Sequence, residues 1–302
     1  MANILVTGGA GFIGSHLTQA LLDRGHFVRI LDNLSSGKPE NIPLHKNVEI
    51  RYGSVNDRID LHYACRDIEY VFHEAAIPSV PLSISDPFST QTAGEIGTLC
   101  LLDEAAKAKA KRVIFAASSS AYGNAPAPQS ESMPPGPLSP YAASKLACEH
   151  YMRAFAACKR VDTISLRYFN VFGPRQDPNS PYSGVISIFL KKMKNGESPT
   201  IYGDGSQRRD FVYVENVVAA NLLAMQIPKG RGEVVNIGCG KSITINELVK
   251  AVNNALNTSI EPTYAPARAG EVFSSEADIS KAKDMLGYLP TISFEDGIRR
   301  MV

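Results

Sequence analysis

The stretch NILVTGGAGFIGSHLTQALLDRGHFVRILD, which spans residues 3–32, decides the fold of this chain. It starts with a short apolar run and closes with a second one at residues 27–31, and each has the length and composition of a buried strand. Between them, a glycine-rich turn leads into a segment whose leucines recur on one side of a helix. The order strand, turn, helix, strand predicts an α/β fold with a parallel sheet.

The turn and the end of the second strand predict a dinucleotide site. The glycines at Gly8, Gly11 and Gly14 permit a tight turn and a close approach of the backbone to a pyrophosphate at the helix N-terminus. Asp32 follows Gly14 by eighteen residues, near the spacing expected for the acid that binds the adenosine ribose. Because its carboxylate repels a 2′-phosphate, NAD is favoured over NADP. The alternative is a turn that serves only helix–sheet packing.

Strands and helices continue to alternate through the first half of the chain. Further strands are predicted at residues 48–52, 70–72 and 112–117, and a helix at 99–110. In open α/β sheets, ligands bind at the carboxyl ends of strands, and Gly8, Asp32, Ala75 and Ser118 all fall at such ends. We therefore expect a Rossmann-type, doubly wound parallel sheet whose crevice holds the cofactor beside Ser118. His73 is interpreted as a packed residue at a strand end rather than as a catalyst.

A second segment, SPYAASK at residues 139–145, predicts proton-transfer chemistry. Ser139 suits a helix cap and Pro140 suits the first turn, so a helix is expected to begin here. Tyr141 and Lys145 then lie one turn apart on the same face, where the cation favours the phenolate. Ser118 and its serine neighbours supply hydroxyls that can shuttle the proton. Such a set suits removal of a proton from a substrate alcohol while another group takes the hydride. The alternative is a chance motif with a tyrosine in the core.

The second half of the chain is more broken by Gly and Pro and predicts a smaller, interleaved α/β domain for the substrate. Helices are predicted at residues 212–224, 244–256 and 279–286, with a strand ending at 237–240 and a last helix still running at Val302. The expected division is a cofactor domain at 1–170, to which 211–238 return, and a substrate domain at 171–210 and 239–302. Arg209 and Arg268 are predicted in glycine-rich loops, where a guanidinium forks onto a diphosphate or, alternatively, forms a surface salt bridge. Tyr202 is either a stacking platform for uracil or an ordinary strand residue.

Composition limits the partners and the compartment. The sequence has 31 basic and 30 acidic residues, a net charge of +1, which argues against a general nucleic-acid or membrane surface. No apolar run reaches transmembrane length, and no signal peptide is visible. The five cysteines are scattered, so we expect free thiols in the cytoplasm and no metal site.

These motifs together resemble a known family. Gly8-x-x-Gly11-x-x-Gly14, Asp32, His73-x-Ala75-Ala76, the serine run and Tyr141-x-x-x-Lys145 resemble the extended short-chain dehydrogenases/reductases. Three later segments resemble the substrate-contacting asparagine segment, the uridine- and phosphate-binding segment and the second arginine site of nucleotide-sugar 4-epimerases; they are LRYFNVFGPR at 166–175, YGDGSQRRDF at 202–211 and RAGE at 268–271. The resemblance covers nearly the whole chain and is strongest to UDP-N-acetylglucosamine 4-epimerases, then to UDP-glucose 4-epimerases.

The resemblance implies NAD-dependent 4-epimerisation of a UDP-hexose through a transient 4-keto sugar, by a homodimer joined near Leu99 and Tyr141. Tyr141 takes the proton of the sugar 4-hydroxyl with help from Ser118, and Lys145 holds the nicotinamide ribose. The implied NAD-binding residues are Gly8, Gly11, Phe12, Ile13, Gly14, Asp32, Asn33, Ser35, Ser36, Gly37, Ser54, Val55, Ala75, Ala76, Tyr141, Lys145 and Phe169. The implied UDP-sugar-binding residues are Ser79, Ser83, Ser118, Ser119, Ser120, Tyr141, Asn170, Val185, Tyr202, Arg209, Arg268, Glu271 and Ser275.

Four positions carry finer expectations. Ser54 replaces an acid that the family places near the adenine, and Gly94 replaces an asparagine, so both local contacts differ here. The rival enzymes, nucleotide-sugar 4,6-dehydratases and UDP-glucuronate decarboxylases, place carboxylates where this chain has Ser119 and Ser120. A non-catalytic NAD-binding scaffold is the remaining alternative, against which the retained Tyr–Lys pair counts.

The C2 side of the sugar carries a separate expectation. Epimerases limited to plain hexoses carry a tyrosine a few residues after the second arginine motif, where this chain has Ser275. A small serine predicts that N-acetylated sugars are accepted. Phe273 lies close enough in sequence to crowd the same space, and the alternative for Ser275 is an ordinary loop hydroxyl.

Overall fold

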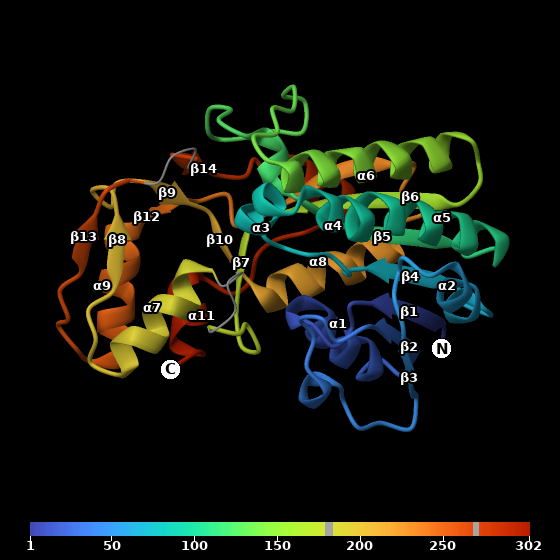
Figure 1. The fold of residues 1–302 in the computed structure, drawn as a ribbon, viewed down its shortest axis with the longest axis horizontal. Coiled ribbons are helices and arrows are strands. Elements are labelled where there is room, and N and C mark those ends of the chain that lie inside the picture. Colours follow the sequence, from blue (N-terminus) through green and yellow to red (C-terminus); the bar gives the residue numbers. More distant parts are fainter. Residues whose placement is uncertain (179–183, 268–271) are drawn as a thin grey trace.

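Figure 1 shows the computed structural model of the chain, which describes residues 1–178, 184–267 and 272–302. A seven-stranded sheet, parallel between all neighbours, has the order β11-β6-β5-β4-β1-β2-β3. The strands are β1 (Asn3–Thr7), β2 (Phe27–Asp32), β3 (Val48–Tyr52), β4 (Tyr70–His73), β5 (Arg112–Ser118), β6 (Asp162–Tyr168) and β11 (Glu233–Ile237). The strand order reverses at β1 and β4, which opens a crevice at their carboxyl ends. The predicted doubly wound sheet is confirmed.

Helices cover both faces of this sheet, because alternate strand residues are apolar on each side. In Figure 1, α1 (Phe12–Leu22) and α8 (Val214–Gln226) lie on one side, and α5 (Gly97–Lys107) and α6 (Pro140–Ala157) lie on the other. Within β1, for example, Ile4 packs into the core under α1 and α8, while Leu5 packs into the core under α5 and α6. The helices α2 (Arg58–Cys65) and α10 (Ser280–Leu286) complete the two layers.

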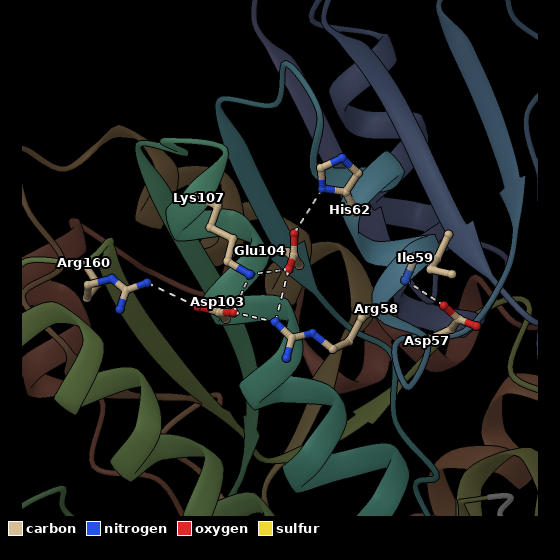
Figure 2. A network of polar contacts seen from close by, with 8 residues as sticks. All are labelled: Asp57, Arg58, Ile59, His62, Asp103, Glu104, Lys107 and Arg160. Carbon is tan, nitrogen blue, oxygen red and sulfur yellow. Dashed lines mark hydrogen bonds and ion pairs between the residues drawn. The ribbon is translucent and has the colours of Figure 1, made fainter.

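A network of charges joins α2 to α5 at the rim of the second layer (Figure 2). Arg58 lies 2.8 Å from Asp103 and 3.5 Å from Glu104, and Lys107 lies 2.8 Å from each of those carboxylates. Arg160, beyond the end of α6, reaches Asp103 at 3.2 Å. Exposed ion pairs contribute little one by one, so the network orients these helices more than it stabilises them.

The smaller part of the molecule lies beside the carboxyl ends of the sheet (Figure 1). Its strands are β7 (Asn170–Phe172) paired with β10 (Phe211–Tyr213), β9 (Arg208–Arg209) between β12 (Ile243–Thr244) and β14 (Ser274–Ser275), and β8 (Thr200–Tyr202) paired with β13 (Thr263–Ala265). Its helices are α7 (Val185–Lys194), α9 (Ile245–Leu256) and α11 (Phe294–Arg299), which enclose a core of their own. The remaining short helices are η1 (Pro39–Asn41), α3 (Val80–Ser85), α4 (Pro87–Gln91), η2 (Thr92–Ile96) and η3 (Ser119–Tyr122).

Three local predictions are corrected. The helix expected at 212–224 starts only at Val214, because Phe211–Tyr213 form β10 and pair with β7. Arg209 lies in strand β9 rather than in a loop, paired between β12 and β14. The last helix ends at Arg299 instead of running to Val302. Across the described ranges, no helix has the length and apolar character required to cross a membrane.

Candidate active site

The glycine turn after β1 is built so that backbone, not side chain, faces the crevice. Gly8 has a φ of +70°, and a Cβ there would lie 2.8 Å from the backbone nitrogen of Ala75. A Cβ at Gly14 would lie 2.2 Å from the Gly8 carbonyl oxygen. Because neither position accepts a side chain, the first turn of α1 lies directly against β1 and its N-terminus opens towards the crevice.

A cavity of about 1030 Å³ occupies this crevice. Its lining includes every residue that the sequence assigned to NAD except Tyr141, Lys145 and Phe169. Phe169 does not line the cavity because it is buried against Tyr122, with 6.3 Å between the ring centroids. An elongated site with a glycine turn at its centre and an acid on the next strand fits a dinucleotide, so these residues would hold NAD.

Asp32 is fixed by the turn that it faces. Its carboxylate accepts hydrogen bonds from the backbone nitrogens of Ala10 at 2.9 Å and Leu34 at 2.8 Å, and the residue is 8% exposed. A carboxylate offers about four acceptor positions. Two therefore remain for the hydroxyls of an adenosine ribose, in the orientation that the two backbone bonds impose.

The two departures from the family pattern have local explanations. At Ser54, the backbone nitrogen donates to the Asp60 carboxylate of α2 at 2.9 Å, which fixes the backbone of this turn beside the cavity. Gly94 lies in η2, where a Cβ would be 2.3 Å from the Ser144 hydroxyl, so an asparagine would require the Ser144 side chain to turn away. Instead, the Gly94 carbonyl accepts a 2.6 Å bond from Thr98.

The helix α6 begins at its predicted cap, and its first two turns carry Tyr141 and Lys145, the predicted proton-transfer pair. The Ser139 hydroxyl accepts a hydrogen bond from the Ala142 nitrogen at 3.2 Å, and Tyr141 follows in the first turn. Lys145 is 6% exposed, and its ammonium donates to the Ala116 carbonyl oxygen at 2.7 Å. This bond fixes the helix on β5, two residues before that strand ends in Ser118.

Ser118 is oriented by its neighbour in η3. Its hydroxyl oxygen accepts from the Ser120 nitrogen at 3.2 Å and from the Ser120 hydroxyl at 2.9 Å. With both acceptor positions used, the Ser118 proton points elsewhere, and the group acts as a donor. Ser120 is thus a support for Ser118, and Ser119 begins the same turn.

Three predicted substrate residues meet although they lie far apart in the sequence. The Asn170 amide nitrogen donates to the Ser275 hydroxyl at 3.1 Å and to the Asp210 carbonyl at 3.0 Å. Ser275 pairs in register with Arg209, whose guanidinium donates to the carbonyls of Arg208 at 2.8 Å and Phe273 at 3.2 Å. Phe273, two residues before Ser275, is 63% exposed.

Other predicted substrate residues are placed differently or lie outside the described residues. Ser79 caps α3 and is 3% exposed, and Ser83 is fully buried and donates to the Val80 carbonyl, so both hydroxyls form hydrogen bonds within the helix. Val185 begins α7, and Tyr202 is an exposed residue of β8. Arg268 and Glu271 lie outside the described residues.

His73 is a packed residue, as expected. It is 1% exposed, and its ring nitrogens lie 2.8 Å from the Thr7 hydroxyl and 2.9 Å from the Thr98 hydroxyl. Burial lowers the pKa of His73 to about 3, and the positive charge of Lys145 adds to this effect. His73 therefore stays neutral and ties β4 to β1 and α5. Among the described residues, no cluster of His, Cys, Asp and Glu is arranged to hold a metal ion.

The sequence interpretation missed several residues of the cavity wall, including its charged side chains other than Asp32. Glu74 lines it directly after β4, at a strand end where the rule for ligand sites applies but where only the following alanines were chosen. The segment after β7 also lines it with Arg175 and Asp177, and Lys38 lies 2.9 Å from Asp177. No local pattern marks that ion pair, because its partners come from different halves of the chain.

Comparisons with known proteins agree with this geometry. Residues 4–238 match the NAD dependent epimerase/dehydratase family. A UDP-N-acetylglucosamine 4-epimerase from Methanobrevibacter ruminantium, solved with UDP-N-acetylmuramic acid, is 44% identical with a TM-score of 0.95, over 99% of this chain and 96% of that one. The Thermus thermophilus UDP-glucose 4-epimerase, solved with NAD, is 37% identical with a TM-score of 0.91, over 98% and 96%.

A sequence relative extends the same similarity. The UDP-glucose 4-epimerase of Mycolicibacterium smegmatis is 38% identical over 304 residues, which cover 99% of this chain and 96% of the relative. The family match, the full-length relatives and the cavity at the glycine turn lead to one conclusion. The chain belongs to the NAD-dependent epimerase/dehydratase family.

Proposed function

We propose that this protein is an NAD-dependent UDP-sugar 4-epimerase. The observation that carries the proposal is the bond from Lys145 to the Ala116 carbonyl, which holds the Tyr141 helix against the strand that ends in Ser118. The cofactor cavity opens at the ends of the neighbouring strands β4 and β1. A sugar hydroxyl at Tyr141 and Ser118 therefore lies next to the place where the nicotinamide belongs.

The side chains suit a proton transfer coupled to a hydride transfer. NAD, when bound, would accept the hydride from C4 of the sugar and return it in the second half of the reaction. Tyr141 takes the proton of the 4-hydroxyl, and Ser118 donates a hydrogen bond to the same oxygen. Lys145, fixed on β5, contributes the positive charge that favours the phenolate and binds the nicotinamide ribose.

The substrate half of the site is proposed from the smaller part of the molecule, at 171–210 and 239–302. Arg209, held by two backbone carbonyls, is assigned to the diphosphate, and Asn170 to the sugar. Between the first and the second hydride transfer, the 4-keto sugar turns about its diphosphate and presents its other face. Tyr202 is assigned to the uracil, and Arg268 to a second diphosphate contact.

The chain lacks the carboxylates that the alternative activities require beside Ser118. Ser119 and Ser120 stand beside Ser118 where dehydratases and decarboxylases of the family carry carboxylates, and Ser120 is used to orient Ser118. A scaffold that only binds NAD has no need for Lys145 pinned beside Ser118. We therefore assign neither activity.

We further propose that the sugar is N-acetylated. Ser275 is small, its hydroxyl faces Asn170, and the bulky Phe273 side chain points into solvent. The Methanobrevibacter ruminantium relative was solved with an N-acetylated sugar nucleotide, which supports the same assignment.

A homodimer in the cytoplasm completes the proposal. Ile84, Ile96 and Leu99 are 65%, 52% and 37% exposed around the start of α5, as expected of an interface formed by these helices. All five cysteines are free, which suits a reducing compartment. Light scattering of the purified protein measures the mass, and a monomer would contradict the dimer.

The test of function uses purified protein and the four UDP-sugars with glucose, galactose and their N-acetyl derivatives. Product 4-epimers are separated chromatographically. We expect conversion of the N-acetylated pair without added metal. Failure to convert any of the four would reject the proposed function, and conversion of the plain pair alone would reject only the N-acetyl assignment.

A further inference from the structure

Glu74 is an ionisable side chain in the cofactor cavity that the proposed reaction does not use. It follows β4 directly and lines the cavity together with Ala75 and Ala76. Because Ala75 and Ala76 line the same wall, a charged side chain is not required there to fill space. A carboxyl group in such a place loses hydration, which is unfavourable unless the charge meets something that stabilises it.

One oxygen of this carboxyl accepts a hydrogen bond from Tyr168, whose hydroxyl is in turn held by Asn221. The Asn221 amide nitrogen donates to the Tyr168 hydroxyl at 2.7 Å and to the Val217 carbonyl at 2.9 Å. Because the Tyr168 oxygen accepts from Asn221, its proton goes to Glu74, 2.8 Å away. The second Glu74 oxygen has no bonding partner among the described residues and is not buried, so it faces the cavity.

The strand register places Glu74 at the reactive end of the cavity. His73 of β4 pairs with Phe115 of β5, so Glu74 lies beside Ala116, whose carbonyl binds Lys145. The Lys145 charge accordingly acts on the Glu74 carboxyl. Asp32 lies at the far, adenosine end, which leaves the end near Glu74 and Lys145 for the nicotinamide.

We propose that the Glu74 carboxylate favours the oxidised over the reduced cofactor in this cavity. The inference rests on the proposed function only in requiring that NAD binds here. The nicotinamide ring is cationic when oxidised and neutral when reduced, so a carboxylate on the wall stabilises the oxidised state selectively. An enzyme that must return its hydride in every turnover gains from this bias, because the reduced state is kept short-lived.

The charge of Glu74 changes within the ordinary pH range. Burial raises the pKa of Glu74 to about 7, although the Tyr168 hydrogen bond and the Lys145 charge both lower it. The carboxylate is therefore present above pH 7, and the preference for oxidised cofactor fades as the pH falls below that value. By linkage, the oxidised cofactor lowers the pKa of Glu74, so in its complex the change lies at somewhat lower pH.

Other ionisable groups surround the same end of the cavity, and Glu74→Gln separates their titration from that of Glu74. Tyr168 from β6 bonds to the Glu74 carboxyl, Lys145 from α6 acts on it through its charge, and the proposed base Tyr141 lies one turn before Lys145 on the same helix. His73, on the same strand, points to Thr98 and stays neutral because burial and Lys145 hold its pKa near 3. The other charged groups that line the cavity are Asp32, Lys38, Arg175 and Asp177, from β2, its loop and the segment after β7.

The experiment measures affinity rather than turnover. Cofactor is stripped from the full chain, and NAD and NADH are titrated by calorimetry between about pH 5 and pH 9 in the absence of sugar. For the unmodified protein, we expect the ratio of the NADH to the NAD dissociation constant to rise about tenfold over this range, the effect of one pKa unit of coupling. In Glu74→Gln, which keeps an acceptor for Tyr168, the ratio should stay at its low-pH value throughout.

Tyr168→Phe is the matched control. It removes a bond that lowers the pKa of Glu74 and leaves the carboxyl in place, so the rise should keep its size and move to higher pH. A ratio that does not vary with pH in the unmodified protein, or that varies equally in Glu74→Gln, would overturn the inference. If Glu74→Gln does not fold, the test is whether the pH-dependent rise of the affinity ratio moves to higher pH in Tyr168→Phe; an unmoved rise would overturn the inference. Absence of all NAD binding would instead refute the proposed function itself.

Discussion

Among the single residues of the site, Ser118 and Lys145 show how the roles are divided. Ser118 has its oxygen occupied by Ser120 and can only donate, whereas Lys145 has its ammonium bound to a carbonyl of β5 and acts through its charge. Neither group is placed to remove a proton. We therefore assign the role of the base to the Tyr141 phenolic oxygen and propose that the other two residues orient and support it.

Replacement of Tyr141 tests this division. Tyr141→Phe keeps the ring and removes the base, so NAD and UDP-sugar should bind as before while turnover falls by about 10²–10⁴-fold. Ser118→Ala removes one hydrogen bond and should cost less. Calorimetry and steady-state rates measure the two quantities separately. Turnover close to that of the unmodified protein in Tyr141→Phe would mean that another group is the base.

Asp32 sets the choice of cofactor. With its carboxylate fixed by Ala10 and Leu34, a 2′-phosphate would meet a negative charge that cannot turn away. We expect NADP to bind at least about tenfold more weakly than NAD, since a repulsion of about 1.4 kcal/mol suffices for that ratio. Asp32→Asn keeps an acceptor and removes the charge, so the ratio should shrink. Equal affinities in the unmodified protein would contradict this assignment.

We propose that Ser275 sets the size limit at the sugar. Ser275→Tyr places a ring next to Asn170, where the C2 substituent must pass as the keto sugar turns. We expect loss of turnover with the N-acetylated UDP-sugars and retention with UDP-galactose. Ser274→Ala, one residue away in the same strand, serves as the control and should change neither. Equal losses with both sugar types in Ser275→Tyr would show that the limit lies elsewhere.

Among the elements, α6 matters most because its first turn carries the base. Ser139 caps that turn, and Ser293 caps α11 with the same geometry at a distance from the crevice. Each Ser→Ala change should lower the unfolding free energy by about 1 kcal/mol. Only Ser139→Ala should also lower turnover, because the fraying turn contains Tyr141, and Ser139→Asp should restore it. If Ser139→Ala and Ser293→Ala changed turnover equally, the Ser139 cap would have no specific role in catalysis.

The elements also show what local sequence can predict. The strands of the large sheet and the start of α6 follow from apolar runs and a Ser-Pro cap, which are local signals. The start of α8 was misplaced because Phe211–Tyr213 form a strand only by pairing with β7. In that pairing, Phe211 lies opposite Asn170, which is distant in the sequence. The hydroxyls of Ser79 and Ser83, which are predicted to bind the substrate, form hydrogen bonds within α3 that the sequence interpretation did not foresee. Glu74 was overlooked because a single acid beside two alanines carries no periodic signal.

At the level of the whole molecule, the reaction needs both parts of the chain at one place. The large sheet supplies the cofactor cavity, Ser118 and the α6 pair, and the smaller part supplies Arg209 and Ser275. Asn170, which starts β7 directly after the large sheet, bonds into the smaller part. The Lys38–Asp177 ion pair joins the loop after β2 to the segment after β7 across the same cavity. The cofactor is thus enclosed by both parts, as expected if it stays bound between turnovers.

The central claim, that one bound NAD takes and returns the same hydride, is tested with a UDP-sugar that carries deuterium at C4. The purified protein, with no cofactor added, should convert it to the 4-epimer, and mass spectrometry should find the deuterium still at C4. Loss of the deuterium to solvent, or conversion that depends on added NAD, would contradict the account.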